Sequence, residues 1–168
     1  ITYRIEGGYL TQPRWATNIR RGKVRGRLIN IYEPEQLSQM SDAQISDAII
    51  ADLHEDAYET QKRECVKFKA DNLALGLEST IFICPKCGEI GKLRSQDNRF
   101  FCECGFEAIY DVYGYLTDKE GKKHTVTELD FAQQKVLKEK IKNWSESEPL
   151  FEDSVTVYRI GANHELIG

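Results

Sequence analysis

The chain has 168 residues, of which 40% are hydrophobic and 30% are charged, and its formal net charge is −4. These values are typical of a globular protein with one compact domain or two small ones. They exclude binding to polyanions through overall charge, and no apolar run approaches the roughly 18 residues of a membrane-spanning helix.

The first residues, ITYRIEGGYL, have the character of a strand, and the chain does not begin with methionine. We therefore expect a piece of a longer protein. Because no secretory leader is recognisable, we also expect a cytoplasmic, reducing environment. In such an environment, closely spaced cysteines bind metal more often than they form disulfides.

Basic residues gather early in the chain, because residues 7–32 hold six basic side chains and no acidic one. A second strand, GKVRGRLINIY, is predicted there, and its alternation would place four cations on one face. Together with a fifth cation just before them, they form a candidate site for phosphate groups or an anionic membrane surface. The five residues are Arg20, Arg21, Lys23, Arg25 and Arg27. A solvated edge strand and a nucleic-acid contact are the alternatives.

A helix is predicted for residues 41–64. Ser41 suits its N-cap, and Gln44 completes a capping box. Ile45, Ile49 and Leu53 recur at the spacing of one helix face.

The most informative stretch is residues 84–105, CPKCGEIGKLRSQDNRFFCECG. Cys84 and Cys87 form one close pair, Cys102 and Cys104 form another, and fourteen residues separate the two pairs. A glycine follows each pair and allows a tight turn that points backbone amides at sulfur. The residues between the pairs suit a β-hairpin, which would bring all four thiols to one metal ion.

Four thiolates complete a tetrahedral shell, so we predict a structural zinc site whose metal contributes to folding. Iron is the alternative metal, since similar turns hold either ion. Two redox-active or free cysteine pairs are the alternative without metal. Residues 84–105 are called the cysteine box. Cys65 is expected to be a thiol that takes no part in this site, and His54, His124 and His164 lack ligand-like spacing to the box.

The rest of the chain predicts a turn, TDKEGKK, then a helix over residues 128–144, and a closing strand, SVTVYRIG. Val136, Leu137, Ile141 and Trp144 would form the buried face of that helix. The sequence thus predicts an α+β fold in three parts. These are a short sheet plus helix (1–64), a β zinc ribbon (65–117), and a hairpin and helical tail (118–168).

Several of these features follow one another as in a known family. A strand ends at Ile5-Glu6-Gly7, a loop runs through Pro13 to Trp15, and Arg21-Gly22-Lys23-Val24 opens a basic strand. Pro34 and an acidic helix start at Ser41 follow. This order resembles the later half of the catalytic domain in the 1-acylglycerol-3-phosphate acyltransferase family. Some bacterial members look similar further on, with a cysteine zinc ribbon after the core. The resemblance covers about residues 1–62 by general pattern and 63–116 by the ribbon.

The resemblance implies an α/β remnant of an acyltransferase core. The family uses a His-x₄-Asp pair, with histidine as general base, and a Phe-Pro-Glu-Gly-type segment for the acceptor's phosphate. Neither occurs here, because Leu129 stands where His124 would need its aspartate and Asp130 is one residue further. In the family's order both motifs would precede residue 1. We therefore predict that this chain alone is inactive.

The preferred hypothesis is the C-terminal region of a phospholipid-synthesis acyltransferase, peripheral at the inner face of a membrane. Its partners would be an upstream catalytic segment and, through the basic strand, an anionic lipid surface. The alternative is a zinc-ribbon module for nucleic acid or a protein, with nucleic acid disfavoured by the acidic chain. A ribbon that only packs on a neighbouring domain is compatible with the first hypothesis. The oligomeric state is left open.

Overall fold

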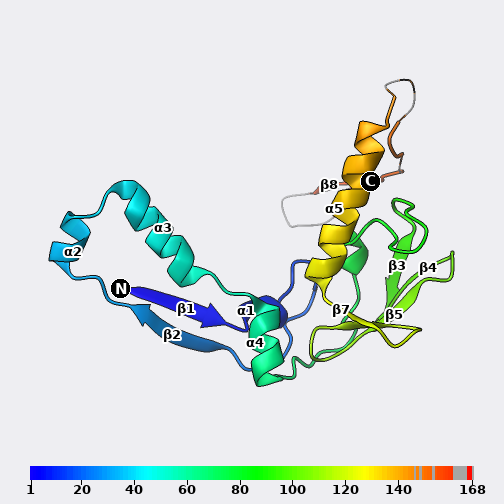
Figure 1. The fold of residues 1–168 in the computed structure, drawn as a ribbon. Helices are drawn as coiled ribbons and strands as arrows, with labels where there is room; N and C mark the ends of the chain where they lie inside the picture. Colours follow the sequence, from blue (N-terminus) through cyan, green and yellow to red (C-terminus); the bar gives the residue numbers. More distant parts are fainter. Residues whose placement is uncertain (146, 148, 153, 161–165, 168) are drawn as a thin grey trace.

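The computed structural model describes residues 1–145, 147, 149–152, 154–160 and 166–167. Its helices and antiparallel sheets form the mixed α+β fold that the sequence predicts. Figure 1 shows two arms that meet at a short middle section. The N-terminal third of the chain builds one arm, and the cysteine box and the long C-terminal helix build the other.

The first arm is built on two antiparallel strands, β1 (Thr2–Glu6) and β2 (Arg25–Asn30). Between them lies α1 (Gly8–Thr11), and after them come α2 (Pro34–Ser38) and α3 (Asp42–Leu53). The helix α3 packs along β1 (Figure 1). The strand predicted for residues 22–32 is shorter than expected, because β2 begins at Arg25 and ends at Asn30.

A buried carboxylate fastens α3 to the strands. Asp52 accepts hydrogen bonds from the Thr2 hydroxyl, the Asn30 amide and the Tyr32 hydroxyl, each at 2.7 Å. The bond from Tyr32 is the main reason why the pKa of Asp52 lies below its ordinary value. This polar contact joins the helix to the ladder.

The opposite face of the β1–β2 ladder is apolar and open. Tyr3 pairs with Leu28 and Ile5 pairs with Gly26 across the ladder. The Tyr3 ring lies so close over Gly26 that a Cβ there would come within 2.4 Å of it. Tyr3, Ile5 and Leu28 are 58%, 62% and 52% exposed. We call these three side chains the open face.

The predicted helix of residues 41–64 is divided in two. Its start is confirmed, because Ser41 and Gln44 form the capping box. However, α3 ends at Leu53, and α4 (Ala57–Glu64) begins after Asp56, whose carboxylate accepts from the amides of Tyr58 and Glu59 at 2.9 and 3.2 Å. Asp56 adopts the extended conformation of an N-cap, so it starts a new helix instead of continuing the old one.

The second arm holds a five-stranded antiparallel sheet in the order β3-β4-β5-β6-β7. The strands are β3 (Leu93–Gln96), β4 (Arg99–Cys102), β5 (Glu107–Tyr110), β6 (Leu116–Asp118) and β7 (Lys123–His124). A short 3₁₀ turn, η1 (Leu77–Ser79), precedes the sheet. The hairpin assigned to the tail therefore continues the sheet of the predicted ribbon.

The long helix α5 (Val126–Lys142) stands on this sheet and begins two residues earlier than predicted. Its first turns are covered, but it extends beyond the sheet (Figure 1). As a result, Val136 and Leu137 are only half-buried, while Ile141 and Trp144 are 52% and 45% exposed. The predicted buried face is therefore wrong: the buried residues of α5 are Val126, Leu129 and Gln133 in its first half, where the helix packs on the sheet.

The end of the chain forms a small antiparallel pair, β8 (Arg159–Ile160) and β9 (Leu166–Ile167). Only two residues of the predicted closing strand are in β8, and Gly161 and His164 lie outside the described residues. Within the part of the chain that the structure describes, no helix has the length and hydrophobicity to cross a membrane.

Two apolar clusters form the core. The larger one lies in the second arm and includes Cys84 and Cys102. Trp15, from the N-terminal part of the chain, also belongs to it. The smaller one joins the arms through Leu10 of α1, Tyr58 of α4 and Phe68. The cysteine box is therefore continuous with the main core and does not hang from it as a separate unit.

Candidate metal centre and the basic segment

Two turns bring the four cysteines of the box together. Cys84 and Cys87 lie in the turn before β3, Cys102 ends β4, and Cys104 lies in the turn before β5. Their sulfurs all lie within 4.8 Å of one another, with 3.6 Å between Cys84 and Cys104 and 3.9 Å between Cys87 and Cys102. Tetrahedral thiolates at zinc lie about 3.8 Å apart. The donor set thus fits one metal ion.

Local turn geometry explains why this sequence forms the cluster. The amide of Gly88 donates to the Cys84 carbonyl at 2.9 Å, and that of Gly105 donates to the Cys102 carbonyl at 3.0 Å. Both glycines adopt left-handed backbone angles, with φ of 73° and 91°. A side chain would strain this conformation, so the glycine after each pair of cysteines is required by the turn.

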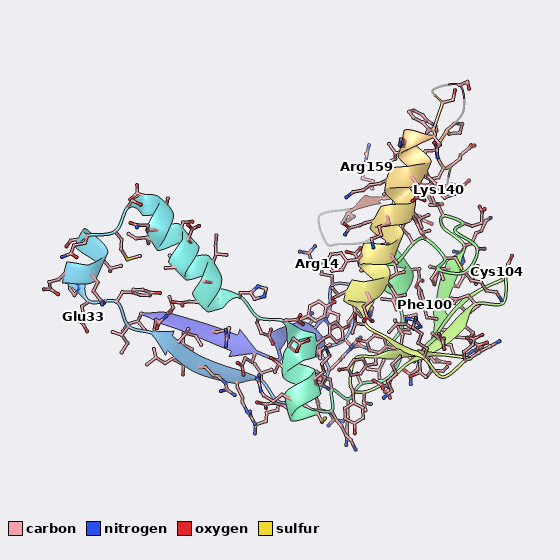
Figure 2. All side chains as sticks on the ribbon, in the orientation of Figure 1. Arg14, Glu33, Phe100, Cys104, Lys140 and Arg159 are labelled. Atoms are coloured by element: carbon pink, nitrogen blue, oxygen red, sulfur yellow. The ribbon has the colours of Figure 1, made fainter. Side chains whose placement is uncertain are left out.

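The four thiols differ in environment. Cys84 and Cys102 are buried, whereas Cys87 and Cys104 are exposed; Figure 2 shows Cys104 at the outer edge of its arm. Burial raises the pKa of the Cys84 thiol to about 12, opposed by hydrogen bonds from the amides of Cys87 and Lys86. A hydrogen bond from the Phe106 amide lowers the pKa of the Cys104 thiol to about 7. A bound cation would stabilise the thiolate form of the buried pair.

A lysine adds positive charge to the cluster. The Lys86 ammonium, in the first turn, lies 3.4 Å from where a Cβ of Gly105 would be, so it reaches over the second turn. Four thiolates and one divalent ion carry a net charge of about −2, which such a cation offsets. A Cys₄ shell leaves no open coordination position, so this arrangement can hold a metal but cannot present it to a substrate.

His124 and Cys65, which the sequence predicts not to be metal ligands, do not belong to the cluster of sulfurs. Among the described residues, these four cysteines are the only group placed to hold a metal ion. His124 bonds Asp118 at 2.7 Å, and Asp130 bonds Gln133 and Gln134. His124 and Asp130, whose spacing comes close to a His-x₄-Asp motif, therefore bond different partners and not each other. Cys65 is exposed at the C-terminal cap of α4.

The structure does not bring the five predicted basic residues onto one surface. Arg20 is buried, and its guanidinium donates to the Leu73 carbonyl at 2.8 Å and to the Tyr110 hydroxyl at 3.1 Å. Arg25 and Arg27 are held in ion pairs within the chain. Arg21 and Lys23 are exposed and form no ion pair with any described residue.

Sequence reasoning missed the acidic partners of these arginines. Glu64 of α4 pairs with Arg25 and also with Arg27, at 3.2 Å for the latter. Glu6 of β1, only 4% exposed, pairs with Arg27 at 2.8 Å and with Arg4 at 3.4 Å. Glu6 lies two residues after Arg4 on β1. Strand alternation places both side chains on one face, so this pair could have been predicted from the sequence. Glu64 is 37 residues from Arg27, and no local pattern indicated it.

Comparison of the chain with protein-family models, with curated proteins and with solved structures gives no match.

Proposed function

We propose that the chain is the C-terminal region of a phospholipid-synthesis acyltransferase that transfers an acyl group to 1-acylglycerol-3-phosphate. The order of motifs in residues 1–62 suggests this assignment, and the open face of the β1–β2 ladder is the observation that supports it. A two-stranded ladder is marginal by itself, and a contiguous apolar patch usually marks a contact surface. The closing strands of a larger α/β sheet would have this face covered by the rest of the domain.

Purified native protein provides the test of this assignment. Peptide mass spectrometry would read the residues that precede Ile1, and acyl transfer to 1-acylglycerol-3-phosphate would be assayed on the same sample. We expect a His-x₄-Asp pair followed by a Pro-Glu-Gly segment upstream, and transfer activity that is lost when that histidine is replaced. A native protein without these motifs and without transfer activity would overturn the assignment.

Within this function, the four cysteines bind one structural zinc ion. Their sulfur distances and the two glycine turns support a closed tetrahedral site. Metal analysis of the purified chain is expected to give one zinc per molecule, and Cys102→Ser is expected to lose it. Iron in place of zinc would correct the metal and leave the site, whereas a chain that takes up neither metal would contradict it.

The basic segment, which is residues 20–27 with its five basic side chains, contributes the contact with phosphate groups of lipids. Arg21 and Lys23 carry this role, because Arg20 is buried and Arg25 and Arg27 are engaged with Glu6 and Glu64. Reversing the charge of Arg25 or Arg27 would break internal ion pairs, so a clean test uses Arg21→Glu with Lys23→Glu.

Binding to phosphatidylcholine vesicles with and without phosphatidic acid would measure this contact. The double variant should lose most of its preference for the anionic vesicles, and added salt should weaken binding of the parent chain. Lys135→Glu with Lys138→Glu is the matched control, since both lysines are exposed on α5 and the charge change is equal. Equal losses in the two double variants would reduce the effect to net charge and contradict a dedicated site. A preference for single-stranded RNA over both vesicles would favour a nucleic-acid module instead.

A further inference from the structure

Arg20 has an unusual position for a cation. It is 2% exposed, and no other basic side chain among the described residues is buried. No carboxylate within the described parts of the chain pairs with it. Its guanidinium carbon lies 4.9 Å from the ring centre of Tyr110 and 5.7 Å from that of Trp15. A buried cation is costly unless its neighbours replace water. Arg20 therefore depends on the exact placing of a carbonyl, a hydroxyl and two ring faces.

The β3–β4 hairpin is hydrogen-bonded to both residues that accept from Arg20, namely Leu73 and Tyr110. At the tip of the hairpin, the Asn98 side chain accepts from the amide of Leu73 at 2.8 Å. The Asn98 carbonyl accepts from the amide of Tyr110, also at 2.8 Å. One turn residue thus positions the Leu73 carbonyl and the Tyr110 hydroxyl, the two groups that receive the guanidinium.

The same hairpin ends in the cysteine cluster. Cys102 is the last residue of β4, and Leu93, which pairs with it across the hairpin, follows the first cysteine pair. Trp15, Leu73 and Tyr110 share one buried cluster with Cys84 and Cys102. A continuous path of strand pairing and packed side chains therefore runs from the metal ligands to Arg20.

On its other side, Arg20 leads directly into the basic segment. Its amide donates to the Thr11 carbonyl at 2.8 Å. Arg21 and Lys69 exchange backbone hydrogen bonds at 2.8 and 2.9 Å. The ring of Phe68 lies against Gly22, where a Cβ would come within 2.1 Å of it. The Arg20 amide bond to Thr11, the Arg21–Lys69 bonds and the packing of Phe68 on Gly22 thus fix the backbone that leads from Arg20 to Lys23.

We propose that Arg20 is a positioning residue that couples the metal centre to the basic segment. Metal binding fixes the base of the hairpin, its tip fixes Leu73 and Tyr110, and these hold Arg20 and the two exposed cations after it. The part played by Arg21 and Lys23 rests on the proposed function, but the coupling does not. Because coupling between two sites is reciprocal, loss of the Arg20 contacts must also weaken metal binding.

Zinc competition against a chromogenic chelator tests the reciprocal effect on the full chain. Arg20→Met keeps the length of the side chain and removes its hydrogen bonds. We expect it to lose zinc at a chelator concentration about five- to tenfold lower than the parent chain, a typical coupling between sites. Arg14→Met is the matched control, because Arg14 lies in the same segment and is exposed. Equal zinc affinity for the two variants would overturn the proposal.

Metal removal tests the forward effect by hydrogen exchange and fluorescence. In a Trp144→Phe background, Trp15 is the remaining tryptophan. Stripping zinc should speed exchange at the amides of Arg20 and Arg21 and should increase quenching of Trp15 by acrylamide, while exchange in α3 stays unchanged. Loss of protection in the cysteine turns with unchanged Arg20 and Arg21 amides would overturn the coupling.

A second variant keeps the test decisive if Arg20→Met does not fold. Asn98→Ala removes the acceptor of the Leu73 amide and leaves Arg20 in place, so it should lower zinc affinity in the same direction by a smaller factor. Unchanged affinity in Asn98→Ala would then count against the proposal. The vesicle assay on these variants separates the two ideas. If zinc affinity falls as expected while the parent chain shows no preference for anionic vesicles, the lipid role of Arg21 and Lys23 is contradicted and the coupling stands.

Discussion

Asp118 is a carboxylate whose neighbours give it a structural role. One oxygen accepts from the Lys122 amide at 2.8 Å, and the other lies 2.7 Å from Nε2 of His124. These contacts close the turn between β6 and β7. The hydrogen bond with His124, helped by the Lys122 amide, holds the pKa of Asp118 below its ordinary value of 3.8. A carboxyl group with a lowered pKa stabilises the folded state above its unfolded pKa, and this stabilisation is lost as pH falls through the folded pKa.

We therefore expect Asp118→Asn to remove part of the acid sensitivity of the fold. Between about pH 5 and pH 3, the free energy of unfolding of the parent chain should fall more steeply than that of the variant. Urea unfolding across this range measures the difference. Asp71→Asn removes an exposed carboxylate and is the control for net charge. The prediction fails if both variants flatten the pH dependence equally.

Residue-scale features were predictable from the sequence where their causes are local. The clustering of the four cysteine sulfurs is confirmed, since spacing and two glycines determine each turn. The capping box of Ser41 and Gln44 is confirmed for the same reason. The environment of Arg20 was not predictable, because its partners Leu73 and Tyr110 are 53 and 90 residues away. Strand alternation assigns a side chain to a face, but it does not say what will cover that face.

At the scale of elements, one side chain anchors α5 to the segment that leads into the metal centre. Gln133 is 5% exposed. Its carbonyl oxygen accepts from the amides of Phe82 and Ile83 at 3.0 and 3.4 Å, and its amide donates to the Thr80 carbonyl at 2.9 Å. The side chain thus replaces the backbone partner that a neighbouring strand would supply.

Gln133→Leu should undock α5 from this segment. The substitution keeps a similar volume but removes the partner of the buried Ile83 amide, which costs about 1–3 kcal/mol. It also removes the partner of the part-buried Phe82 amide and Thr80 carbonyl, which water can partly replace. We expect the free energy of unfolding to drop by about 2–3 kcal/mol, measured by urea denaturation with zinc present. Gln134→Leu is the control, since Gln134 is exposed and its side chain bonds only Asp130 among the described residues. Equal losses in both variants would show that Gln133 has no special role.

The limits of element prediction also have physical causes. Apolar spacing predicted one helix over residues 41–64, but Asp56 competes as an N-cap and divides it into α3 and α4. Spacing likewise predicted that Val136, Leu137, Ile141 and Trp144 form the buried face of α5, yet the sheet covers only the first turns of the helix. Periodicity reports which residues share a face, whereas the length of the partner element decides how much of that face is covered.

At the scale of the whole molecule, the two arms differ in how well they bury their apolar surface. The second arm has a continuous core that includes two metal ligands. The first arm has a polar contact between α3 and the strands, and its apolar residues Tyr3, Ile5 and Leu28 face outward. A domain normally buries the apolar face of its sheet against another layer. The proposed function supplies that layer from an upstream catalytic segment.

This difference predicts opposite effects of one double substitution in two contexts. Ile5→Thr with Leu28→Thr keeps strand propensity and makes the open face polar. In the chain of residues 1–168, self-association measured by sedimentation velocity should decrease, because a hydrophobic contact surface is removed. In a longer native protein the same change should lower the free energy of unfolding by about 1.5–3 kcal/mol for each buried side chain. Phe131→Thr is the control, since Phe131 is 60% exposed on α5, away from the open face. If Phe131→Thr reduces self-association as strongly, or if the double variant leaves the longer protein equally stable, the open face is not covered by an upstream segment.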